Sequence, residues 1–348
     1  MMLRQLPVLQ ENYFAHGKVL PWEEIPPADE AFVQAWEGYL QDCTKTGVLA
    51  GLRKRLVQLN FPVQQGMASD PEYRLAARRG LVTAARKRAK GTELNDPANL
   101  KTYLYQTFAG RIPVLETGNR KDFETLVRAF AHSNEPVEIP ASMGACMIKG
   151  YNNWDRVAQY KRKLAENFDF TRLKAQKELY QDSFLILTDS EYSGVPAEML
   201  GLSPAEWRKL SKIIRIEHEA THYCTLRILG SARNHLLDEF IADYLGIVSA
   251  AGRYRARWFL CFMGLESYPD YRKGGRLANY IKNLDLSPQQ FNFLKTVVKT
   301  AAENGEKIFN KYHQAGYSEQ DKYLMFLKLT KMNLLQLASD TAEEYFDC

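Results

Sequence analysis

Apolar residues recur at intervals of three and four along most of the chain, which is the spacing of helices that bury one face. In residues 29–40, for example, Phe32, Ala35, Trp36 and Tyr39 fall on one side. The same spacing predicts helices over residues 49–59, 121–132, 160–179, 203–229, 253–265, 287–310 and 319–346. The Pro-rich residues 1–30 are expected to form an extended lead-in.

The middle of the chain has a different pattern. Short apolar runs predict strands at residues 112–116 and 183–188, and residues 136–139 are extended. A turn at Ser142 is expected to lead into a strand near Met147, and residues 94–107 are expected to be loop and short helix. The segment 184–188 is either a buried central strand or a sheet edge that could bind a peptide as an added strand, and the strand near Met147 is a second candidate for such an edge.

These elements predict an α+β fold that is mostly helical. We expect residues 1–110 to form an N-terminal, mainly helical extension and residues 111–348 to form one domain. Within that domain, residues 111–200 should be mixed α/β, residues 203–251 should hold two consecutive helices, and residues 252–348 should be helical.

The helix at residues 203–229 has clear start and stop signals. Ser203 can accept a backbone hydrogen bond, Pro204 is suited to the first helical position, and Glu206 can complete a capping box. Gly230 is a plausible stop.

Two histidines on this helix point to metal chemistry. His218 and His222 are four residues apart, so their imidazoles lie on one face and can hold one zinc ion. Glu219 lies beside them and can reach a water on that metal without ligating it. The alternative is a buried histidine pair that is hydrogen-bonded to Glu219 or Glu239 and binds no metal.

A second helix, capped by Ser231 or Asn234, should follow after a short turn and pack back against the first. Glu239 on this helix can then supply the third metal ligand, and Asp243 can accept the free N–H of a ligating histidine. Gly246 would permit close contact between the two helices.

The motif His218-Glu-Ala-Thr-His222 followed by Glu239-Phe-Ile-Ala-Asp243 resembles the gluzincin clan of thermolysin-like zinc metallopeptidases. The resemblance covers about 45 residues and implies a zincin-like fold, with a small sheet before the metal-binding helices. It implies one zinc ion per chain held by His218, His222 and Glu239, with Glu219 as general base and Asp243 orienting a histidine. One departure is Arg215, where an uncharged residue is commoner.

The same resemblance implies hydrolysis of peptide bonds in a peptide or protein substrate. Gluzincins also need a side-chain donor that stabilises the oxyanion. The candidate donors are Tyr271, Arg276, His235 and His313, and nothing in the sequence chooses among them.

Composition sets outer bounds on the kind of protein. The chain has 348 residues, 45% hydrophobic and 25% charged, which is ordinary for a globular protein. No signal-like start and no apolar run long enough to span a bilayer are found, so we expect a cytoplasmic protein with no membrane partner. The scattered Cys43, Cys146, Cys224, Cys261 and Cys348 agree, since they form no C-x-x-C pair, and Cys224 should point away from the metal face.

Other functional classes remain open. The basic stretch at residues 71–90 includes Arg78, Arg79, Arg86, Lys87 and Arg88, but no aromatic residue interleaves with it after Tyr73. Because the net charge is only +5, we expect a solvated helix face and not a nucleic-acid-binding surface. A non-catalytic scaffold that keeps the zincin fold is the main rival. A di-metal carboxylate protein would need a second Glu-x-x-His, which the chain lacks.

Overall fold

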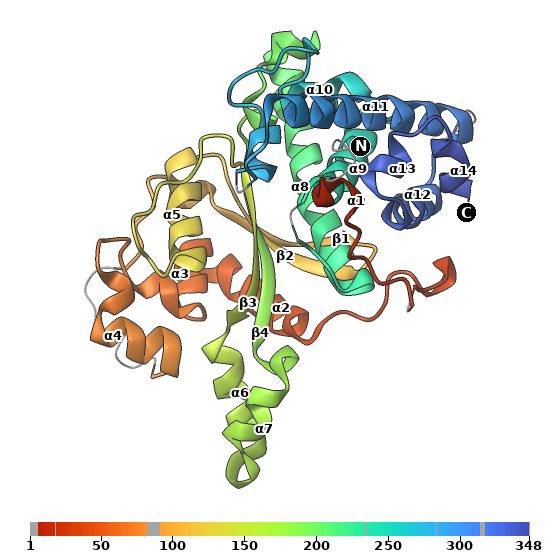
Figure 1. The fold of residues 1–348 in the computed structure, drawn as a ribbon. Coiled ribbons are helices and arrows are strands. Elements are labelled where there is room, and N and C mark those ends of the chain that lie inside the picture. Colours follow the sequence, from red (N-terminus) through yellow and green to blue (C-terminus); the bar gives the residue numbers. More distant parts are fainter. Residues whose placement is uncertain are drawn as a thin grey trace. The chain divides into compact units, whose positions relative to one another are not determined.

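The computed structural model of the protein describes residues 6–17, 19–81, 91–233, 235–282, 284–313 and 317–347. Its fold is α+β and mostly helical, as the sequence predicts, with a four-stranded mixed sheet (Figure 1). The expectations for Asn234, Cys348 and the basic residues Arg86, Lys87, Arg88 and Lys90 fall outside the described residues. No helix among the described residues is both long and apolar enough to cross a membrane.

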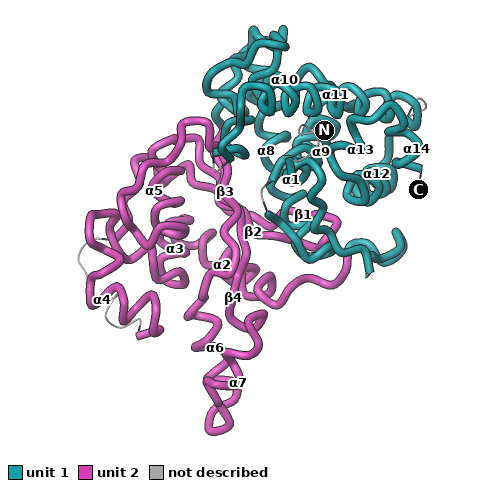
Figure 2. Tube along the Cα trace, in the orientation of Figure 1, with its two compact units in different colours: residues 1–26, 190–348 teal, residues 27–189 magenta. Residues whose placement is uncertain are grey.

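The chain divides into two compact units, coloured separately in Figure 2. Unit 1 combines residues 1–26 with residues 190–348, and unit 2 comprises residues 27–189. The boundary expected after residue 110 instead falls within an antiparallel pair, in which Thr107 is opposite Gly110. Hydrogen bonding between the two strands keeps that part of the chain in one unit.

The sheet lies in unit 2 and has the order β1-β2-β4-β3. Its strands are β1 (Lys101–Thr107), β2 (Gly110–Thr117), β3 (Ala145–Asn152) and β4 (Gln181–Thr188). β4 pairs with β2 in parallel and with β3 antiparallel. Of the two alternatives for residues 184–188, the structure therefore has the buried central strand and not the sheet edge. The expectation of loop and short helix at residues 94–107 is wrong over β1, because pairing with β2 makes this half-exposed segment a strand.

The helices of unit 2 are α2 (Ala31–Thr46), α3 (Val48–Arg53), α4 (Pro71–Tyr73), α5 (Arg120–Ala131), α6 (Trp154–Leu164) and α7 (Phe170–Ala175). α2 and α5 pack on the same side of the sheet, since Trp36 and Phe130 lie 5.4 and 5.0 Å from the ring of Phe184. The single helix expected over residues 160–179 is wrong. α6 begins six residues earlier, where Asn153 caps it, and ends before Ala165, whose φ is +47°.

Unit 1 is helical. It contains α1 (Pro7–Gln10), α8 (Pro204–Leu229), α9 (Leu236–Ala251), α10 (Ala256–Met263), α11 (Pro288–Tyr312), α12 (Glu319–Lys331), α13 (Leu334–Leu337) and α14 (Ala342–Asp347). The continuous helix expected over residues 319–346 is three helices, because Asn333 forms a new capping box with Gln336 and so starts α13.

α8 begins and ends where the sequence predicts. The Ser203 hydroxyl accepts a hydrogen bond from the Glu206 backbone N–H, and Gly230 ends the helix with a φ of +68°. α9 is capped by His235 and not by Ser231. The two helices approach closely at Gly246, where an added Cβ would lie 2.9 Å from the carbonyl oxygen of Ile214.

Candidate metal centre

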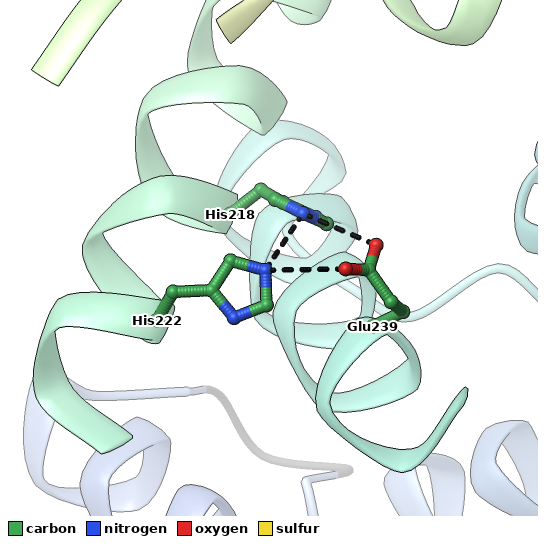
Figure 3. Close-up of side chains that lie close together, drawn as sticks. All are labelled: His218, His222 and Glu239. Carbon is green, nitrogen blue, oxygen red and sulfur yellow. Dashed lines mark hydrogen bonds and ion pairs between the residues drawn. The ribbon is translucent and has the colours of Figure 1, made fainter. Parts of the chain in front are cut away.

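Three buried side chains of unit 1 converge between α8 and α9. Figure 3 shows His218 and His222 on successive turns of α8, both directed at Glu239 on α9. The two Nε2 atoms lie 3.1 Å apart. Each Nε2 also lies 3.5 Å from a different oxygen of the Glu239 carboxylate. Among the described residues, this is the group of His, Cys, Asp or Glu side chains whose ligand atoms are close enough to share an ion.

The spacing of these atoms fits a tetrahedral zinc ion. Two ligands each about 2.0–2.1 Å from zinc, at the tetrahedral angle, lie about 3.4 Å apart. The separations of 3.1 and 3.5 Å bracket that value. Two imidazoles and one carboxylate supply three ligands, which is the number that catalytic zinc sites take from protein. Cys224 is buried and does not belong to the group.

Asp243 orients His218. Its Oδ1 lies 2.8 Å from Nδ1 of His218, and the carboxylate is fully buried one turn after Glu239 on α9. Because a carboxylate accepts the Nδ1–H, the lone pair of this histidine is at Nε2, the atom directed at Glu239 and His222. The contact between Asp243 and His218 has the geometry that the predicted role of Asp243 requires.

Two further residues complete the surroundings of Asp243. The hydroxyl of Tyr192 donates to Asp243 Oδ1 at 2.6 Å and lies 2.8 Å from His218 Nδ1. Arg276 donates to the other carboxylate oxygen, and its Nη1 donates to the Tyr192 hydroxyl at 2.9 Å. Burial raises the pKa of Tyr192 well above its ordinary value, so the hydroxyl keeps the proton that it donates.

Glu239 is held in the same manner. The hydroxyl of Tyr280 donates to its Oε2 at 2.6 Å. Arg276 and Tyr280 belong to one short 3₁₀ helix, Arg276–Tyr280. This segment therefore contacts two carboxylates of α9, Asp243 through Arg276 and Glu239 through Tyr280.

The electrostatics of the centre favour positive charge between the three side chains. Burial alone would lower the pKa of His222, but hydrogen bonding and attraction from Glu239 outweigh it and raise that pKa to about 9. Burial would raise the pKa of Glu239, but the two histidines outweigh it and hold that pKa below its usual range. Either a proton or a metal cation can supply this positive charge. A divalent cation would also be bound by the lone pairs of both imidazoles.

Glu219 follows His218 on α8 and is half-buried, whereas the three converging side chains are almost fully buried. Its negative charge contributes to the raised pKa of His222, which places the carboxylate near the centre. No hydrogen bond ties it to another side chain among the described residues, so it is available to a water or a substrate.

Three of the four candidate oxyanion donors have other hydrogen-bond partners. Arg276 belongs to the centre, but it binds Asp243 and Tyr192. The Tyr271 hydroxyl donates to the Gly275 carbonyl at 2.7 Å, His235 caps α9, and His313 follows the last residue of α11. Arg215, the departure from the resemblance, is buried and donates to the Ser190 carbonyl at 2.7 Å.

Comparison with known proteins gives a family without a function. A family model described as "Family of unknown function (DUF7005)" matches residues 1–341. Neither the curated proteins nor the solved structures contain a match to the chain.

Proposed function

This chain belongs to the DUF7005 family, and we propose that it acts as a zinc-dependent hydrolase. The observation that carries the proposal is the convergence of His218 Nε2, His222 Nε2 and the Glu239 carboxylate within 3.1–3.5 Å of one another. The hydrogen-bond partners of His218 and Glu239 support the proposal, because they hold both side chains in the orientation that a metal requires.

The residues have distinct roles in the proposed reaction. A zinc ion in this centre would supply Lewis acidity that polarises a carbonyl and makes water more acidic. Glu219 accepts the proton of the attacking water and returns it to the leaving nitrogen, so its carboxylate is unchanged after one turnover. Asp243 and Tyr192 hold His218 in one tautomer, and Tyr280 fixes the Glu239 carboxylate.

We further propose that the chain is zincin-like, with the sheet at residues 101–188 before the metal-binding helices in sequence, and that the bond cleaved is a peptide bond in a peptide or protein. The support is the gluzincin resemblance of the motif, together with the convergence of His218, His222 and Glu239 and the contact of Asp243 with His218. The helical context also agrees, since α8 and α9 pack closely at Gly246 and α10 to α14 follow them.

Replacing Glu219 by Gln tests the proposal. Glu219→Gln should retain zinc at the level of the unaltered protein, because Glu219 is not among the ligands. Hydrolysis of a quenched-fluorescence peptide library should fall by about 10²–10⁴-fold, the usual contribution of a general base. Glu206→Gln, at the start of α8, is the matched control and should leave both zinc content and hydrolysis unchanged.

The same experiment separates the proposal from a non-catalytic scaffold that keeps the fold. A scaffold would bind zinc but show no hydrolysis that depends on Glu219. Full activity in Glu219→Gln would remove Glu219 as general base and contradict the mechanism.

A further inference from the structure

The net charge of the chain resides in unit 2. Residues 27–189 contain 24 Lys and Arg against 19 Asp and Glu, a difference equal to the +5 of the whole chain. The remaining residues contain 22 of each. Within unit 2, basic residues gather in the segment from α6 to β4, at Lys161, Arg162, Lys163, Arg172, Lys174 and Lys177. This asymmetry favours an anionic partner for unit 2 and not for unit 1.

A cavity of about 320 Å³ lies within this basic region. We call it the aromatic–basic pocket. Its lining residues include three cations and three aromatic side chains, namely Arg78, Arg79, Lys174, Trp154, Phe170 and Tyr180. None of the described residues that line it is acidic. A volume near 300 Å³ is at the lower end of small-molecule sites, so the pocket suits one small ligand or one unit of a larger one.

The wall of the pocket is preformed. The Trp154 indole N–H donates to the Ala77 carbonyl at 2.7 Å, which fixes the ring against the π-helical turn Arg74–Arg78. The backbone passes so close to the ring at Gly80 that an added Cβ would lie 2.4 Å from Trp154 Cε3. Gly80 also has a φ of +73°, so both space and conformation demand glycine there. π-helical turns occur frequently at functional sites.

The cations of the pocket have no acidic partner among the described residues. Arg78 donates to the Ala68 carbonyl, and Lys174 lies 5.0 Å from the centre of the Phe170 ring. A neighbouring cavity differs, because Arg55 in its lining is already paired with Asp155 at 3.2 Å and with Asp42 at 2.6 Å. The charge in the aromatic–basic pocket is therefore available to a ligand.

We propose that the aromatic–basic pocket binds a nucleotide, either free or as the phosphorylated end of a single strand. A planar base is suited to the aromatic lining, because stacking requires only a π-face. A phosphate is suited to two arginines and a lysine, which supply more positive charge than one carboxylate needs. The sequence pattern argued against such a site, since no aromatic residue interleaves with the basic stretch at residues 71–90 after Tyr73. The fold supplies aromatic side chains instead from α6, α7 and Tyr180, the residue before β4.

Isothermal titration of the full chain with AMP tests the proposal. AMP should bind more than tenfold more tightly than adenosine or inorganic phosphate alone, since each lacks one half of the ligand. Arg79→Glu and Lys174→Glu should each weaken AMP binding by about tenfold or more, because each removes a charged hydrogen-bond donor and adds repulsion. Both side chains are exposed, so the fold should be retained.

Lys163→Glu is the matched control. It changes the net charge by the same amount on α6, but Lys163 does not line the pocket. AMP affinity should be unchanged in this variant. An equal loss in Lys163→Glu, or no AMP binding at millimolar concentration, would overturn the proposal.

Short oligodeoxyadenylates with and without a 5′ phosphate distinguish the two sources of the nucleotide. Preference for the phosphorylated strand over AMP, lost in Arg79→Glu, would identify a strand end. Preference for AMP would identify a free nucleotide. Binding of oligonucleotides that is insensitive to both pocket variants would contradict the site.

Discussion

At the scale of single residues, Asp243 is the acceptor that His218, Tyr192 and Arg276 share. Its carboxylate is fully buried. A buried carboxylate with several charged or polar donors fixes the positions of all of them. Asp243 is therefore the residue that fixes the orientation of His218.

Replacing Asp243 by Asn should weaken zinc binding without removing any metal ligand. The expected loss of affinity is about 10–100-fold, the usual effect of removing the acceptor behind a ligating histidine. Competition with a chromophoric chelator measures it. Circular dichroism of the same sample checks the fold, because the change also leaves Arg276 without its acidic partner. Unchanged affinity in a folded variant would remove Asp243 from the centre.

Tyr280→Phe tests the hydrogen bond to the Glu239 carboxylate, and this substitution removes only one hydroxyl group. Phenylalanine keeps the ring but removes the hydroxyl that donates to Glu239. Zinc affinity should fall by about 2–10-fold, which corresponds to one hydrogen bond of about 0.5–1.5 kcal/mol. The same chelator competition measures it, with Tyr271→Phe as control because that hydroxyl donates to the backbone of Gly275. Equal losses in both variants would mean that neither is specific to the centre.

The sequence predicts the residues at the centre better than their partners. His218, His222, Glu239 and Asp243 are spaced by helical turns, and helical spacing is visible in a sequence. Tyr192 precedes α8, and Arg276 and Tyr280 follow α10, so only tertiary packing brings them to the centre. Arg276 was a candidate on chemical grounds, but its binding to Asp243 could not be predicted without the fold.

At the scale of elements, strong local signals are confirmed and weak ones are not. α8 has a serine cap, a proline at its first position and a terminal glycine, and both of its ends are as predicted. β1 was missed because its exposed polar residues carry no buried strand pattern, and its pairing with β2 decides its structure. The capping box at Asn333 and the cap at Asn153 were signals present in the sequence, but the continuous helical spacing of apolar residues hid them.

The α8–α9 contact depends on a glycine. In Gly246→Ala the added Cβ would meet the Ile214 carbonyl at 2.9 Å, and overpacking of this kind costs about 1–3 kcal/mol. The gain in helix propensity, up to about 1 kcal/mol, offsets only part of it. Thermal unfolding should therefore occur at a lower temperature.

Gly38→Ala is the matched control for that change. Gly38 is also inside a helix, is exposed, and has no atom within 4 Å of an added Cβ. Its replacement should leave stability unchanged or raise it by up to about 1 kcal/mol. If Gly246→Ala were equally well tolerated, close packing at Gly246 would not position the metal centre.

At the scale of the whole molecule, the division into units could not be predicted from composition alone. Unit 1 joins an N-terminal segment to the chain after residue 189, and contacts between residues far apart in the sequence hold it together. The Asn12 side chain, for example, donates to the carbonyls of Thr330 and Met332. Linear patterns identify neither such contacts nor the concentration of net charge in unit 2.

The division also separates the two proposed sites. Among the described residues, those of the metal centre belong to unit 1 and those that line the aromatic–basic pocket belong to unit 2. A substitution that abolishes one site should therefore leave ligand binding at the other site measurable in the same full-length protein.

The most direct test of the account is the metal content of the purified, unchelated protein beside His222→Ala. Elemental analysis should find about one zinc per chain in the unaltered protein and little in the variant, because two remaining ligands hold zinc weakly. Glu219→Gln, analysed in parallel, should retain the metal. If neither the unaltered protein nor the variant took up added zinc while both remained folded, His218, His222 and Glu239 would be a structural cluster and the hydrolase proposal would be contradicted.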